Sequence, residues 1–93
     1  MQLKDALFNW LQIQIVWEAR PSDRSARDTV LFFTEILRED HQVSDLEKRE
    51  EESEYVISFR QHDEMLSYSF PKEAAEKLLS DIVSEPKYNQ SFE

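Results

Sequence analysis

The apolar residues of this chain are densest in LKDALFNWLQIQIVW, residues 3–17, which also contains both tryptophans. If this segment is a helix, Leu3, Leu7 and Leu11 share one stripe at the spacing of a buried face. The opposite stripe is polar at first, but after Ile13 apolar residues point to nearly every side. We therefore predict one helix over residues 3–17, covered by the rest of the domain on one side and by another molecule on the other.

The second half of this segment also fits a strand. Residues 11–17, LQIQIVW, alternate between polar and apolar types and are rich in β-branched and aromatic side chains. A short helix followed by a strand at Leu11–Trp17 is therefore an open alternative. The single helix is favoured because no turn residue interrupts residues 3–17.

The remainder of the chain predicts two more helices and three strands. Arg20-Pro21 ends the first helix, because proline disfavours helical geometry at the residue before it. An apolar face spaced by three and four residues predicts a second helix from Asp23 to about Glu39. An acidic segment that is either a short edge strand or an irregular crossing follows, and then a hairpin with one buried face. A third amphipathic helix is expected to cover the sheet. The ranges are 43–49, 55–60 and 65–70 for the strands and 72–83 for the third helix.

These elements predict an α+β fold with the order α-α-β-β-β-α, in which a small antiparallel three-stranded meander packs against helices. If residues 11–17 form a strand, the order becomes α-β-α-β-β-β-α and the sheet has four strands. A chain of 93 residues suits one domain. We expect this domain to span residues 1–84, with a frayed tail at 85–93.

Several features are missing from the sequence, and each absence narrows the function. The chain has no cysteine, which excludes disulfides and cysteine-ligated metals and suits the cytoplasm. It has no glycine, which excludes the phosphate-binding loops of nucleotide enzymes. Turns with a positive φ then require other residues, and we expect them at His62, Asp63 and Asn89. We see no secretory signal and no apolar run of about 18 residues, and therefore expect no membrane partner.

The net charge of −9 is unevenly distributed along the chain. Residues 39–54 contain eight acidic residues against two basic ones, so this segment alone carries −6. A chain with this charge repels nucleic acid and anionic membranes, and we predict neither as a partner. A basic protein surface remains a possible partner for the acidic segment.

Two clusters contain the residue types that bind metals: Glu39-Asp40-His41 and His62-Asp63-Glu64. If the two clusters met in space, their imidazoles and carboxylates would suit a divalent transition metal. Neither has a recognised metal spacing, and a helix C-terminus and a tight turn account for them better than a metal does. No glycine elbow accompanies the serines. We therefore predict no metal, no cofactor, no small-molecule substrate and no enzymatic activity.

The predicted function is a small non-catalytic protein-interaction or regulatory module that forms a homodimer through its first helix. An alternative is an acidic inhibitor or decoy that binds a basic protein surface, in the manner of a nucleic-acid mimic or an immunity protein. Structural roles compete with both functions, because tryptophans usually belong to a core and acidic runs to a solvated turn. The candidate surface residues are Trp10, Ile13, Val16, Trp17, Glu50, Glu51, Glu52 and Glu54.

Overall fold

The computed structural model describes residues 1–85, and its element order confirms the predicted α+β fold with a three-stranded antiparallel meander. The predicted tail lies outside these residues, apart from Glu85, and so does Asn89. None of the helices within residues 1–85 has the length and apolar content needed to span a bilayer. The elements are α1 (Leu3–Ala19), α2 (Arg24–His41), β1 (Val43–Glu50), β2 (Glu54–Gln61), β3 (Glu64–Pro71) and α3 (Lys72–Ser84).

The first helix, α1, runs without interruption through the segment that also fitted a strand. The alternative with a strand at Leu11–Trp17 and a four-stranded sheet is therefore wrong. The helix wins because it buries one continuous stripe, and its i, i+3 and i+4 contacts outweigh the local β preference of the isoleucines. The buried residues of α1 are Ala6, Leu7, Trp10, Leu11, Ile15 and Val16.

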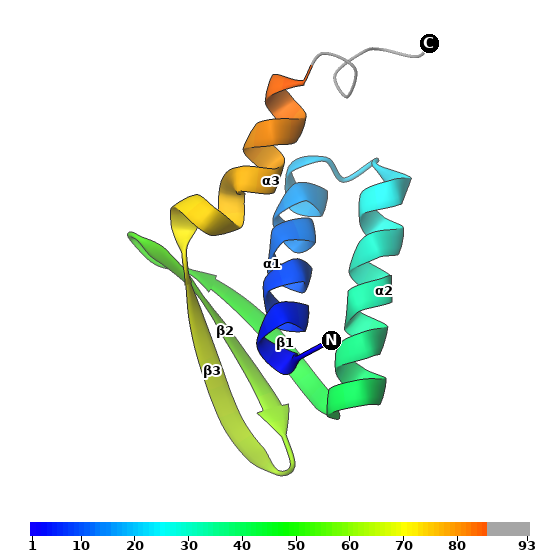
Figure 1. The fold of residues 1–93 in the computed structure, drawn as a ribbon, viewed down its shortest axis with the longest axis vertical. Coiled ribbons are helices and arrows are strands. Elements are labelled where there is room, and N and C mark those ends of the chain that lie inside the picture. Colours follow the sequence, from blue (N-terminus) through cyan, green and yellow to red (C-terminus); the bar gives the residue numbers. More distant parts are fainter. Residues whose placement is uncertain (86–93) are drawn as a thin grey trace.

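The second helix, α2, runs antiparallel to α1 and lies beside it (Figure 1). Its N-cap is Asp23, one of the two caps, Ser22 or Asp23, that the sequence allows, and the carboxylate of Asp23 accepts a hydrogen bond of 3.1 Å from the backbone N–H of Ala26. Its C-cap is Gln42 in the left-handed region, at φ 55°. The helix therefore continues two residues beyond the predicted end at Glu39, and the chain turns there without glycine.

The sheet has the order β1-β2-β3, so β2 is its central strand. A two-residue turn at His62 and Asp63, both with positive φ as predicted, joins β2 to β3. Buried β2 side chains at Tyr55, Ile57 and Phe59 face the helices and join the core that α1 and α2 complete. The central strand therefore supplies most of the sheet's share of the core.

The third helix, α3, packs mainly on α1 and contacts the sheet only near its own beginning (Figure 1). The expectation that it covers the sheet is therefore wrong. The reason is the connection: β3 ends at Pro71 and α3 begins at Lys72, so no loop allows the helix to fold back over the strands. The backbone N–H of Lys72 instead donates to the carbonyl of Ser53 (3.0 Å), which ties the start of α3 to the β1–β2 turn.

Tyr55 attaches α3 to the sheet, because its hydroxyl donates a hydrogen bond of 2.6 Å to Glu76 Oε2. Burial of the ring, followed by this hydrogen bond, raises the pKa of Tyr55 well above its ordinary value. An unfolded tyrosine ionises near pH 10, whereas the folded Tyr55 keeps its proton at that pH. The unfolded state therefore binds fewer protons above about pH 10, and folding stability must fall as the pH rises.

The comparison of wild type with Tyr55→Phe tests this link between the ionisation of Tyr55 and folding stability. At pH 8 we expect the variant to be less stable, by about 1.5–3 kcal/mol, because it loses a hydrogen bond to a charged group. Above pH 10 the wild-type advantage should shrink by up to about 1.4 kcal/mol per pH unit, since phenylalanine does not titrate. Urea unfolding at pH 8, 10 and 11 measures both values. A difference that stays constant over this range would contradict the raised pKa.

Candidate functional site

The predicted α1 surface is only partly available to a partner. Trp10 and Val16 are buried within the chain, and Ile13 and Trp17 are half-buried. All four residues therefore contribute to the monomer's own core or to its margin. Of these four residues, only Ile13 and Trp17 retain surface that another molecule could reach.

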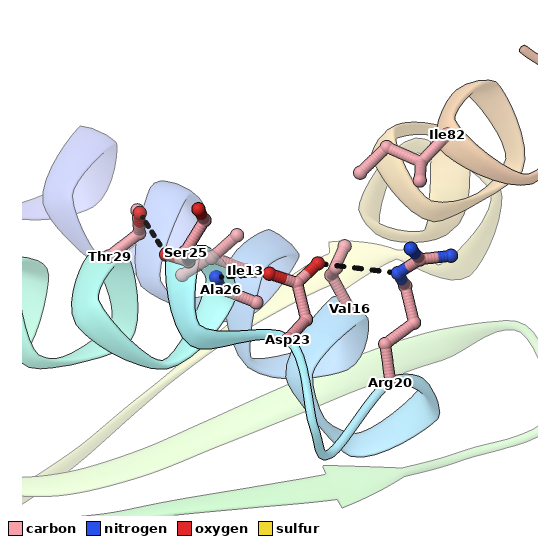
Figure 2. A pocket seen from close by; sticks show the side chains of 8 residues that line it. All are labelled: Ile13, Val16, Arg20, Asp23, Ser25, Ala26, Thr29 and Ile82. Atoms are coloured by element: carbon pink, nitrogen blue, oxygen red, sulfur yellow. Dashed lines mark hydrogen bonds and ion pairs between the residues drawn. The ribbon is translucent and has the colours of Figure 1, made fainter. Parts of the chain in front are cut away.

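The groove at the junction of the three helices is lined partly by Ile13, and Figure 2 shows its eight residues. Its volume is about 250 Å³, and its walls come from the end of α1, the start of α2 and the end of α3. The lining residues are Ile13, Val16, Arg20, Asp23, Ser25, Ala26, Thr29 and Ile82.

The polar groups of this groove serve the fold rather than a ligand. Arg20 Nε lies 3.3 Å from Asp23 Oδ2, and the other oxygen of Asp23 caps α2 (Figure 2). The hydroxyl of Thr29 donates to the carbonyl oxygen of Ser25 at 2.7 Å. We therefore do not assign a binding site to the groove.

The acidic turn lies between β1 and β2, and two of its four candidate glutamates have basic partners. Glu50 Oε2 is 2.6 Å from Lys72 Nζ, and this hydrogen-bonded pair holds the pKa of Glu50 below its ordinary value. Glu51 pairs with Arg49 at 3.1 Å. Glu52 is exposed and Glu54 is half-buried at the start of β2. The turn is therefore less negative than its sequence suggests, and the Glu50–Lys72 pair fixes the start of α3.

The two histidines lie at the end of α2 and in the β2–β3 turn, and they do not form a metal site. His41 is the last residue of α2, and its ring nitrogen Nε2 lies 3.0 Å from the carbonyl oxygen of Met1. His62 occupies the β2–β3 turn. Nowhere in residues 1–85 do three or more histidine, aspartate or glutamate side chains gather around a point where a metal ion would fit.

The free edge of β3 is the surface that the sequence interpretation missed. Seven of the eight residues of β3 are exposed, and only Phe70 is buried. Leu66 and Tyr68 point to the helix-covered side of the sheet, yet they are 37% and 39% exposed because none of the helices in residues 1–85 covers them. Met65, on the opposite side, is 57% exposed. The strand therefore presents three large apolar side chains together with the N–H and C=O groups of its outer edge.

The two edges of the sheet differ sharply. β1 carries a bulge between Ser44 and Glu47, a positive φ at Asp45 and several charged side chains. Bulges and charges of this kind protect an edge strand from pairing with another chain. The interior of β3, residues 65–70, has no charge, no proline and no bulge. Its edge, at one margin of the sheet (Figure 1), is therefore the unprotected one.

Comparisons of the chain with models of protein families, with curated proteins and with solved structures found no match. The fold and surfaces define a small α+β domain with one protected and one unprotected sheet edge. Its function must be inferred from these surfaces.

Proposed function

We propose that this protein is a small non-catalytic protein-interaction module that binds its partner through the edge of β3. The observation that carries the proposal is an eight-residue strand whose outer edge has no partner strand within residues 1–85, combined with exposed Leu66, Tyr68 and Met65. Main-chain hydrogen bonds from an edge strand supply affinity, and pockets for alternate side chains supply specificity. Other exposed large apolar residues, such as Leu31 and Phe32 on α2, lack this backbone contribution.

The state of the titratable groups supports a function without catalysis. Within residues 1–85, the groups whose pKa is clearly displaced are Tyr55 and the members of two ion pairs, Glu35 with Arg38 and Glu50 with Lys72. Burial or an ion pair explains each displacement, and none of these groups lines the groove between the three helices. Perturbed groups at an active site normally share a cleft. We also propose that the protein acts in the cytoplasm, which suits a chain without cysteine.

A photo-crosslinking experiment in the native host tests the proposal. A photo-reactive phenylalanine analogue replaces Tyr68 in β3 and, in a separate control, the exposed Phe32 in α2. We expect the Tyr68 position to give a discrete protein adduct whose peptides mass spectrometry identifies, and the Phe32 position to give much less of it. No discrete adduct at Tyr68, or equal adducts at both positions, would reject β3 as the interaction edge.

A second candidate function is the acidic decoy, which the exposure of Glu51 and Glu52 favours. The decoy depends on charge, whereas the β3 edge does not. Substituting Gln at Glu50, Glu51, Glu52 and Glu54 should therefore leave the Tyr68 adduct unchanged if the module binds through β3. Loss of the adduct in this variant, together with its loss at high salt in the wild type, would favour the decoy.

A further inference from the structure

We propose that the partner of the β3 edge is a second copy of this chain. The two β3 strands pair antiparallel about a two-fold axis, and the two three-stranded sheets become one continuous sheet. The helices of both copies then lie on the same face. This inference rests on the proposed function and names its partner, and it moves the dimer contact from α1 to β3.

The backbone of β3 determines which residues can pair. In a two-residue hairpin turn the flanking residues, here Gln61 and Glu64, form a hydrogen-bonded pair, and such pairs alternate along the ladder. The even-numbered residues of β3 therefore bond to β2. The hydrogen bond from Lys72 N–H to Ser53 O continues this alternation beyond the strand. The N–H and C=O groups of Met65, Ser67 and Ser69 consequently point away from β2, toward the free edge.

One register uses all of these groups. If Ser67 lies opposite Ser67 of the second copy, then Met65 lies opposite Ser69 of that copy, and the reverse pair forms by symmetry. Each of the three pairs exchanges both of its hydrogen bonds. A shift by two residues in one direction brings Pro71, which has no N–H, opposite a bonding residue. A shift in the other direction moves a pair onto the turn residue Asp63. The register centred on Ser67 therefore pairs the largest number of outward-facing N–H and C=O groups.

The side chains agree with this register. On the helix-covered side, Leu66 faces Tyr68 of the second copy and Tyr68 faces its Leu66, two aliphatic–aromatic pairs of a stabilising kind. Both residues are exposed in one copy alone and become covered in the dimer. Glu64 lies opposite Phe70 rather than opposite another acid. The same register therefore satisfies the backbone and covers the apolar side chains.

The distribution of charge favours a second copy despite the net charge of −9. Residues 65–69, at the centre of the interface, are uncharged, and Glu64 lies at its margin opposite Phe70, whereas most of the acidic segment, residues 39–54, lies on β1 and its turn. In the paired sheet the two β1 strands are separated by five strand spacings of about 4.8 Å, roughly 24 Å in total. This distance is about three Debye lengths at physiological ionic strength, so repulsion between the acidic edges is largely screened.

The test begins with light scattering of the purified full chain during size-exclusion chromatography. Between about 5 µM and about 500 µM, the range of weak specific association, the wild type should approach twice the chain mass of 11.2 kDa. Ser67→Lys places two like charges opposite each other at the axis and should raise the dissociation constant roughly tenfold or more. Ser67→Asp should do the same. An equimolar mixture of the two variants should restore a dimer, because only this register places residue 67 opposite itself.

The matched control is Ser44→Lys, the same substitution on the opposite edge strand, which should dimerise like the wild type. Circular dichroism checks that all three variants fold, as expected for exposed positions. A wild type that remains monomeric at 500 µM, or a Ser67→Lys dimer as stable as wild type, would overturn the inference. A heterologous adduct at Tyr68 together with a monomeric wild type would reject the second copy while retaining the interaction module.

Discussion

Replacing Phe59 by alanine should lower the free energy of unfolding by about 3–5 kcal/mol, the range observed when a large aromatic side chain is deleted from a core. Phe59 is 0% exposed and lies on the central strand β2, beneath the helices. Its ring is also 5.8 Å from the ring of Tyr68. A domain of this size has a total stability of about 5–14 kcal/mol. The substitution should therefore remove a large share of it.

The control for this prediction is Phe32→Ala, the same chemical change on α2. Phe32 is 59% exposed, so its removal leaves no cavity, and we expect a change below about 1 kcal/mol in spite of its contact with Phe33. Urea unfolding followed by circular dichroism gives both values. Equal losses for the two variants would mean that the core is not centred on β2.

The favoured prediction gave the observed order and type of the elements, because most of them carry a strong local pattern. The period of α2 and the alternation of β2 and β3 are unambiguous, and Asp23 supplies a standard cap. The ambiguity of Leu11–Trp17 arose because isoleucine and tryptophan suit both a helix and a strand. Packing resolved it, since the helix buries Leu11, Ile15 and Val16 on one side.

The candidate surface was harder to predict, because it depends on which faces remain uncovered. Alternation correctly placed Leu66, Tyr68 and Phe70 on one face of β3, but alternation does not say how far a helix reaches. The direct connection from Pro71 to α3 leaves Leu66 and Tyr68 exposed. The sequence signal for this exposure is that only residue 71 separates the predicted strand 65–70 from the predicted helix 72–83.

The ion pairs of the acidic turn were also not predictable from the sequence. The sequence displays the charges of residues 47–54, but it does not display their partners across the fold. Lys72 is 22 residues away from Glu50 and still lies 2.6 Å from it, because β3 returns the chain to the β1–β2 turn. A charged run that is half paired inside its own domain steers other molecules less strongly than its net charge suggests.

The second large predicted loss of stability follows from interrupting the helix α1. Gln14→Pro should lower the free energy of unfolding by about 3 kcal/mol or more, because proline removes the hydrogen bond to the carbonyl of Trp10 and its ring clashes with that carbonyl. Gln14 itself is half-buried, and its side chain donates to Glu18 Oε2 at 2.8 Å. Little packing is therefore lost with the side chain itself, and the effect reports on the backbone.

Gln14→Ala provides the matched control at the same position. Alanine removes the same exposed hydrogen bond to Glu18 but retains the backbone and has the highest helix propensity, so we expect a change within about 0.5 kcal/mol. The difference between the two variants, measured by urea unfolding, isolates the helical hydrogen bond and its geometry. A kink at residue 14 would also displace the buried Trp10 on one side and Ile15 on the other. Equal stability of the proline and alanine variants would contradict a continuous helix through the segment on which the whole core is assembled.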